Sequence, residues 1–167
     1  MIYFKPKHFK ATDGSHLPIL IKVVLMTNGP ILELGTGFFY TPVLHWLCAE
    51  KKRKLVSYES QIAYMEVAKN YLTDFHEIHL VNDWSQIDIS QHWSIVLVDH
   101  GPGPQRKIEF ARVANNADYV VVHDTEPNND KYYHFSEITP LYKYRYDYDK
   151  LYPNTSVFSN FKDLSGL

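Results

Sequence analysis

Cysteine and long hydrophobic runs are both scarce in this sequence. Cys48 is the single cysteine among 167 residues, so no disulfide can form within the chain, and its place in an apolar run predicts a buried thiol in a reducing compartment. The longest apolar stretch, Leu17–Met26, contains Pro18 and Lys22 and is too short to cross a bilayer. The first ten residues hold no apolar core of a signal peptide. We therefore expect no membrane partner and a location in the cytoplasm.

The sequence also lacks an excess of positive charge. Its 17 basic and 19 acidic residues give a net charge of −2, which disfavours a surface built mainly to neutralise nucleic-acid phosphates. Apolar residues make up 45% of the chain and charged residues 22%, the balance of a globular protein. Because 167 residues suit one hydrophobic core, we expect a single domain over residues 1–167.

Short apolar segments alternate with segments of helical period. Strands that alternate with helices imply right-handed crossovers and a parallel sheet. The expected fold class is α/β, with a doubly wound, mainly parallel, seven-stranded sheet, helices on both faces and a C-terminal antiparallel hairpin. Strands are predicted at 31–34, 54–58, 78–81, 94–98 and 119–122, and the closing hairpin at 142–148 and 155–159. Helices are predicted at 17–25 after a Ser15 cap, from a Thr41 cap onward, at 61–72 after a Ser60 cap, at 105–115, and around 132–138. In the helix at 61–72, one face is expected to be buried, and it holds Ile62, Met65, Ala68 and Leu72.

Acidic residues and glycines gather where the predicted strands end. In open α/β sheets, ligands bind beyond the carboxyl ends of the strands. The run 33–37 reads Glu-Leu-Gly-Thr-Gly, and glycine lets the backbone turn and approach a ligand that a Cβ would block. Glu59 ends the second strand, where it can accept hydrogen bonds from a ribose diol, and Asp83 with Trp84 follows the third, where the acid can accept from an adenine amine. A two-glycine turn alone is more often just a turn, and Tyr40 replaces the third glycine of the dinucleotide fingerprint.

Taken in order, these residues resemble the class I S-adenosylmethionine-dependent methyltransferases. The shared features are an E-x-G-x-G turn after the first strand, acids at the ends of the next two strands, an aspartate ending the fourth, and a terminal hairpin. The resemblance implies that the glycine turn passes the methionine part of S-adenosylmethionine, that the second-strand acid holds the ribose, and that the third-strand acid meets the adenine. The cofactor-binding residues it implies are Glu33, Leu34, Gly35, Thr36, Gly37, Glu59, Ser60, Asp83, Trp84 and Asp99.

The candidate reacting centre lies at the ends of the fourth and fifth strands. Asp99 and Asp124 end these neighbouring strands, so we expect their carboxylates to converge. They resemble the acids of metal-dependent O-methyltransferases, and with Glu126, His123 or Asn128 they could share a divalent cation such as Mg²⁺. Alternatively, Asp99 or His100 acts as a general base, which makes Asp99, His100 and Asp124 the candidate catalytic residues. The structural interpretations are that Asp99 caps a helix and that His123 is a satisfied histidine at a strand end.

Two hypotheses for function remain open. The leading one is a small methyltransferase that uses S-adenosylmethionine and an unidentified oxygen or nitrogen acceptor. A small-molecule acceptor is expected, while a nucleic-acid or protein acceptor and a homodimer stay open. The alternative is a cofactor-binding Rossmann-like protein without methyl-transfer activity, which serves as a scaffold or subunit.

The nine histidines show no H-x-x-x-H or Cys-His spacing, so no structural zinc site is expected. Arg106 is expected to be solvated, and the four tyrosines at 142, 144, 146 and 148 to pack in the core from one strand face.

Overall fold

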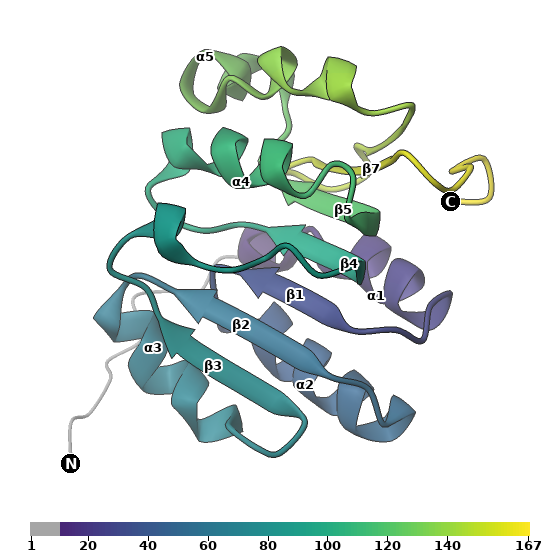
Figure 1. The fold of residues 1–167 in the computed structure, drawn as a ribbon. Coiled ribbons are helices and arrows are strands. Elements are labelled where there is room, and N and C mark those ends of the chain that lie inside the picture. The colour runs from purple at the N-terminus through teal and green to yellow at the C-terminus, as the bar shows by residue number, and fades with distance from the viewer. Residues whose placement is uncertain (1–10) are drawn as a thin grey trace.

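A seven-stranded sheet organises the computed structural model, which describes residues 11–167. The strands are β1 Ile31–Leu34, β2 Leu55–Glu59, β3 His76–Leu80, β4 Trp93–Val98, β5 Ala117–His123, β6 Tyr144–Tyr148 and β7 Thr155–Ser159. They lie in the order β3-β2-β1-β4-β5-β7-β6 (Figure 1). β1 to β5 are parallel, and β7 runs antiparallel to β5 and β6. The predicted α/β fold with its closing hairpin is confirmed. The strand order reverses between β1 and β4, where this fold class opens a crevice.

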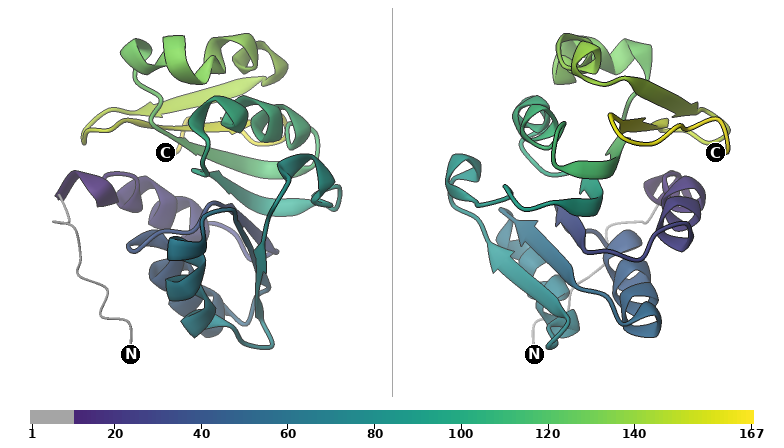
Figure 2. Two further views of the ribbon diagram at one scale, coloured as in Figure 1. Left: turned by 90° about the vertical axis from the view of Figure 1, so that its left-hand side faces the viewer. Right: turned by 45° about the vertical axis from the view of Figure 1, so that its right-hand side comes forward.

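Helices cover both faces of the sheet (Figure 2). They are α1 Leu17–Leu25, α2 Tyr40–Lys51, α3 Ile62–Ala68, α4 Arg106–Arg112 and α5 Asp130–Tyr133. Alternation along β4 divides the core, because Ile95 and Leu97 pack in the cluster that holds α1 and α2. Val96 and Val98 pack in the cluster that holds Phe110 of α4. The same alternation decides which side chains at the strand ends can meet.

One crossover of the fold has no α-helix. Between β3 and β4 the chain forms a single 3₁₀ turn, Trp84–Gln86. Trp84 and Ile89 are both buried and pack in the core on the α4 side of the sheet. Two large side chains of this irregular segment, Trp84 and Ile89, therefore cover the sheet where the other crossovers have an α-helix.

The three predicted helix caps have other partners. The hydroxyl of Ser15 donates to the carbonyl of Pro153 at 2.7 Å, and α1 follows His16 as its N-cap. Thr41 lies inside α2, which begins at Tyr40. The hydroxyl of Ser60 donates to the carbonyl of Gly101 at 3.1 Å. Ser15 and Ser60 thus each bond to a neighbouring loop, whereas the Thr41 hydroxyl donates to Glu33 of β1 at 2.8 Å.

The predicted helix at 61–72 is shorter and turned differently. α3 gives way to a 3₁₀ turn over Lys69–Tyr71. Of the four residues predicted to be buried on one face, Ala68 is buried and Met65 half-buried, but Ile62 is 68% exposed and Leu72 60%. Tyr64 and Val67 join Ala68 in lining a pocket that α2 also lines. Packing against α2 sets the rotation of the helix. The predicted helix at 105–115 is likewise shortened to α4, with a 3₁₀ turn at Gly103–Gln105 before it.

Two packing predictions can be compared directly. Cys48 is buried in the core, as expected. Tyr144, Tyr146 and Tyr148 are half-buried against the cluster on the α1 side. Tyr142 packs in the opposite cluster and stacks on Phe110, since it precedes β6, so the four tyrosines do not share one face. No helix in the described part of the chain is long and apolar enough to span a membrane.

Candidate functional site

A cavity of about 280 Å³ lies at the carboxyl edge of β1, β2 and β4. It is bounded by the glycine turn after β1, by the end of β2 and by the residue after β4. The lining residues are Asp13, Thr36, Gly37, Phe38, Phe39, Tyr40, Glu59, Gln61, Tyr64, Asp99, Gly101, Arg106 and His123. The glycine turn, Glu59 and Asp99 therefore border one space, as predicted from their places at strand ends.

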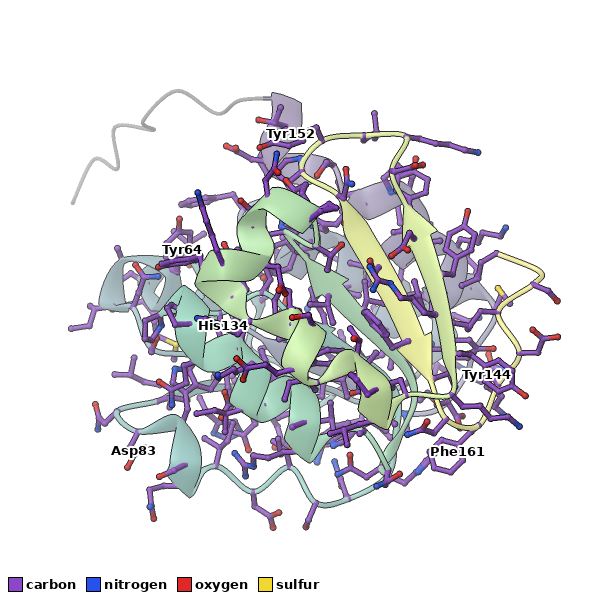
Figure 3. The ribbon with its side chains drawn as sticks, turned by 90° about the horizontal axis from the view of Figure 1, so that it is seen from above. Tyr64, Asp83, His134, Tyr144, Tyr152 and Phe161 are labelled. Carbon is purple, nitrogen blue, oxygen red and sulfur yellow. The ribbon has the colours of Figure 1, made fainter. Side chains whose placement is uncertain are left out.

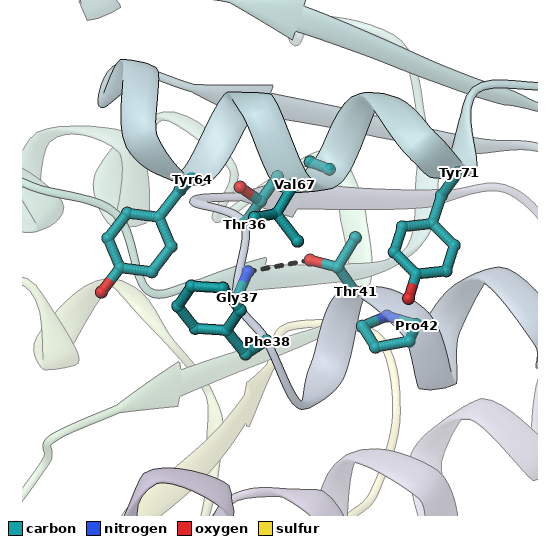
Figure 4. A pocket seen from close by; sticks show the side chains of 9 residues that line it. Thr36, Gly37, Phe38, Thr41, Pro42, Tyr64, Val67 and Tyr71 are labelled. Carbon is teal, nitrogen blue, oxygen red and sulfur yellow. Dashed lines mark hydrogen bonds between the residues drawn. The ribbon is translucent and has the colours of Figure 1, made fainter. Parts of the chain in front are cut away.

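A smaller pocket adjoins this cavity (Figure 4). It lies between the glycine turn, α2 and α3, where Thr41 and Pro42 face Val67 and Tyr71. Its volume of about 20 Å³ is close to the minimum that holds one water molecule. A nucleoside needs the larger cavity, so the small pocket is not the candidate site.

The glycine turn is fixed by contacts with the chain itself. Gly35 has a φ of +92°, and a Cβ there would lie 2.6 Å from the Cα of His100 and 2.7 Å from the carbonyl of Asp99. The backbone N–H of Gly37 donates to the hydroxyl of Thr41 at 2.8 Å. Glycine is thus required at Gly35 by the loop after β4, which passes against it, and this requirement holds whether or not a ligand binds.

Glu33, a residue of β1, supports the turn through Thr41. Its side chain is fully buried and accepts hydrogen bonds from the hydroxyls of Thr41, at 2.8 Å, and of Ser57. Burial raises the pKa of Glu33 to about 8, although the two hydroxyls oppose the shift. The hydroxyl of Ser57 also lies 2.8 Å from Nε2 of His76. Glu33 and the buried Leu34 therefore do not line the cavity. Glu33 holds the Thr41 hydroxyl, which in turn accepts from the backbone N–H of Gly37 in the cavity wall.

Glu59, at the end of β2, is one of the acids that border the cavity. It is almost fully buried, and its Oε2 accepts from the backbone N–H of Thr36 at 2.7 Å and from the Thr36 hydroxyl at 3.0 Å. Its Oε1 accepts from the backbone N–H of Gln61 at 2.7 Å. A carboxylate offers about four acceptor positions, so one position on Oε1 remains for a ligand hydroxyl. Ser60, whose hydroxyl is bonded to Gly101, does not line the cavity.

The two residues predicted to meet an adenine lie elsewhere. Asp83 is exposed and accepts from the backbone N–H of Ser85 at 2.9 Å, as the cap of the 3₁₀ turn. Figure 3 shows its side chain at the periphery, pointing outward. Trp84 is buried, and its indole N–H donates to the carbonyl of Gly101 at 3.0 Å. Because the crossover after β3 has no helix, this segment folds over the sheet and does not border the cavity.

The carboxylates of Asp99 and Asp124 converge on Arg106. Its two terminal nitrogens lie 2.9 Å from Asp99 Oδ1 and 2.9 Å from Asp124 Oδ2. Its Nε donates to the carbonyl of His100 at 2.6 Å, and the Tyr133 hydroxyl donates to Asp124 at 2.9 Å. Arg106 is only 9% exposed, so its predicted solvation is wrong. Its guanidinium bridges the two acids, and this arrangement does not support Mg²⁺ between Asp99 and Asp124.

His100 lies on the opposite side of its loop from the cavity. Its side chain is fully buried, with Nε2 3.2 Å from a carboxylate oxygen of the equally buried Glu109. The ring stacks on Trp84 with centroids 3.9 Å apart. These contacts hold the imidazole in the core, where it cannot reach an acceptor in the cavity. Of the three candidate catalytic residues, only Asp99 lines the cavity.

Two histidines that sequence reasoning did not bring together meet beside Asp99. His16 is fully buried, and its ring centroid lies 4.7 Å from that of His123 and 4.8 Å from that of Tyr40. His123 has Nδ1 3.5 Å from Asp99 Oδ1 and Nε2 3.1 Å from the hydroxyl of Ser15. Burial, reinforced by His123, lowers the pKa of His16 to about 4. For His123, burial is outweighed by Asp99, so its pKa is raised.

The carboxylate of Asp99 lies between Arg106 and the two histidines, His16 and His123. Burial would raise the pKa of its carboxyl, but Arg106 and His123 outweigh burial and hold the pKa well below its ordinary value. Asp99 is therefore ionised at neutral pH. It presents a carboxylate to the cavity between one permanent cation and two imidazoles.

Comparison with known proteins identifies the fold. No protein-family model and no curated protein sequence matches the chain. A putative O-methyltransferase from Klebsiella pneumoniae matches with a TM-score of 0.66 at 13% identity, over 94% of this chain and 84% of that one. The O-methyltransferase TomG from Streptomyces achromogenes, involved in tomaymycin synthesis and solved with S-adenosylmethionine, has a TM-score of 0.63 at 18% identity, over 94% and 83%. An O-methyltransferase from Bacillus cereus, solved with S-adenosylhomocysteine, has a TM-score of 0.62 at 14% identity, over 92% and 84%. The chain has the fold of the class I S-adenosylmethionine-dependent methyltransferases.

Proposed function

We propose that this protein is a methyltransferase that binds S-adenosylmethionine in the cavity between the glycine turn and Glu59. The observation that carries the proposal is that this turn, the carboxylate ending β2 and the carboxylate following β4 border one cavity of about 280 Å³. In open α/β sheets this edge is the usual place for a ligand. The structural neighbours solved with S-adenosylmethionine or S-adenosylhomocysteine support the same cofactor.

The cavity offers a hydrogen-bond acceptor for the ribose of this cofactor but only ring contacts for its adenine. Glu59 keeps one acceptor position for a ribose hydroxyl, because Thr36 and Gln61 occupy the others. Phe38 and Tyr64, whose ring centroids lie 5.3 Å apart, offer apolar surface to an adenine. Asp83 and Trp84 do not line the cavity, so adenine recognition would rest on ring contacts, without the acid that the resemblance implied.

The end of the cavity beside Asp99 would hold the methyl acceptor. Tyr40, Asp99, Arg106 and His123 line it with hydroxyl, carboxylate, guanidinium and imidazole groups, which suit a polar small molecule. The O-methyltransferase neighbours favour an oxygen acceptor. When bound, S-adenosylmethionine supplies a methyl group already activated by its sulfonium charge, so the protein mainly has to align the acceptor and exclude water. Asp99 is the residue we expect to orient the acceptor.

One observation favours the alternative, cofactor binding without methyl transfer. Most acceptor positions of Glu59 are used within the chain, and Asp99 is paired with Arg106, so both acids are already engaged. Incubation with cofactor that is radiolabelled in its methyl group separates the two. The label should pass to a panel of phenols, catechols and amines if the protein is a methyltransferase. A protein that binds the cofactor yet labels none of them, nor any cell-extract component, would be the scaffold of the alternative.

A matched pair of variants tests the site itself. Glu59→Gln removes one acid of the cavity wall, whereas Glu66→Gln changes an exposed acid of α3 that pairs with Lys69. We expect weaker S-adenosylmethionine binding by calorimetry for Glu59→Gln and unchanged binding for Glu66→Gln. Equal affinity of the two variants would place the cofactor elsewhere.

A further inference from the structure

We propose that His16, Asp99 and His123 form a binding site for a divalent transition-metal ion. The residues come from three separate segments: the start of α1, the loop after β4 and the end of β5. One ligand atom from each lies within 4.8 Å of the others. Bonds of about 2.0–2.2 Å to a bound ion put two ligand atoms at most about 4.4 Å apart, so a small inward movement of the side chains closes the site.

His16 provides the strongest sign of a missing partner. Its side chain is fully buried, and neither ring nitrogen has a hydrogen-bond partner among the described residues. An unsatisfied buried polar group is costly, and a metal ion bound to one nitrogen would remove part of that cost.

The hydrogen bonds of Ser15 orient His123 for the same role. The Ser15 hydroxyl has a single proton, which it donates to the carbonyl of Pro153 at 2.7 Å. At its 3.1 Å contact with His123 the hydroxyl must therefore accept, which assigns a proton to Nε2. Nδ1 is then the nitrogen that points toward Asp99, at 3.5 Å from its Oδ1. A metal-binding histidine whose second nitrogen donates to a neighbouring group is the usual arrangement.

The donor set selects the kind of metal. Two imidazoles and one carboxylate suit Zn²⁺, Co²⁺, Ni²⁺ or Fe²⁺, whereas Mg²⁺ prefers oxygen ligands. The site therefore differs from the Mg²⁺ site predicted at Asp99 and Asp124. Asp124 remains bonded to Arg106 and Tyr133, which balances the guanidinium charge beside the metal.

The site borders the large cavity. Asp99 and His123 line it, so a metal with three protein ligands would keep its open positions on that side. There it would supply a Lewis acid to the acceptor, a use that rests on the proposed function. Metal binding itself does not depend on methyl transfer.

The test is a Co²⁺ titration of the metal-stripped protein, monitored by visible absorption and by calorimetry. We expect one ion per chain, with an absorption band that Zn²⁺ abolishes by displacement. His16→Ala should lose more than the roughly 10–100-fold in affinity typical of changes outside the ligand set, and Ser15→Ala should fall within that range. His92→Ala changes an exposed histidine paired with Asp118 and should bind as the wild type does.

Thermal melting checks that each variant is folded, and His16→Gln replaces His16→Ala if the smaller side chain prevents folding. His16 does not line the cavity, so a folded His16→Ala or His16→Gln variant should still bind S-adenosylmethionine. Loss of metal binding can therefore be distinguished from failure of the proposed function. Wild-type binding no tighter than that of the His16 variants would overturn the proposal, as would an equal loss in His92→Ala.

Discussion

Arg106→Met should destabilise the protein strongly, because it removes the cation between two mostly buried carboxylates. The side chains of Arg106, Asp99 and Asp124 are 10%, 12% and 18% exposed, and both ion pairs measure 2.9 Å. Removing one partner of a buried pair costs about 3–5 kcal/mol, since a charge is left uncompensated. The variant also loses the 2.6 Å hydrogen bond to the carbonyl of His100. We expect a loss of at least about 3 kcal/mol in the free energy of unfolding at pH 7.

Urea denaturation measures this loss, with Arg112→Met as the matched control. Arg112 also donates to the carbonyls of Trp84 and Ile87, but its side chain is 31% exposed and its one ion pair among the described residues, with Glu109, is longer, at 3.5 Å. The control should therefore cost less. The pKa of Asp99 is held below its unfolded value, largely by Arg106, so this stabilisation is present above the unfolded pKa and is lost as the pH falls through the folded pKa. A loss below about 1 kcal/mol for Arg106→Met, the range of exposed ion pairs, would refute the buried bridge.

Two further predictions concern the glycine turn and its support. Gly35→Ala should lower the free energy of unfolding by at least about 1–2 kcal/mol for the left-handed backbone alone, and by more because its Cβ would lie 2.6 Å from the backbone of His100. The control in the same urea titration is Gly166→Ala, because a Cβ there meets nothing within 4 Å. Equal urea midpoints for the two variants would contradict the contact at Gly35. Burial raises the pKa of Glu33 from 4.5 to about 8, so the folded state binds more protons between these values and stability should fall as the pH rises through this window, by up to about 1.4 kcal/mol per pH unit. Glu33→Gln should flatten that slope in thermal melts from pH 5 to 8, and an unchanged slope would mean that another group is responsible.

Much of the fold was predictable because burial imposes a clear period on the sequence. β4 is buried along its whole length and apolar except at Ser94, and β5 is apolar from Tyr119 to Val122, as expected of strands covered on both faces. The acids and glycines that follow the strands mark the carboxyl edge. Helix ends were less predictable. Ser15, Thr41 and Ser60 have the composition of caps, but each hydroxyl bonds to a distant loop or buried group.

The site was predictable where it depends on strand ends and not where it depends on packing. Glu59 and Asp99 follow from their strands, and alternation along β4 and β5 sends Asp99 and His123 to the face covered by α1. His100 faces the other side, against Glu109. Nothing local in the sequence places His16 beside them, since it arrives only when α1 packs on the sheet. The displacement of Asp83 likewise follows from a crossover that forms no α-helix.

The proposed function requires that the cavity bounded by the glycine turn and Glu59 binds S-adenosylmethionine. Calorimetric titration of the protein with S-adenosylmethionine and with S-adenosylhomocysteine measures this binding. One site per chain should be found for each ligand, and Glu59→Gln should weaken it by about 1.5–3 kcal/mol, the value of a hydrogen bond to a charged group. A folded protein that binds neither ligand, or a Glu59→Gln variant that binds both with wild-type affinity, would rule out this binding site.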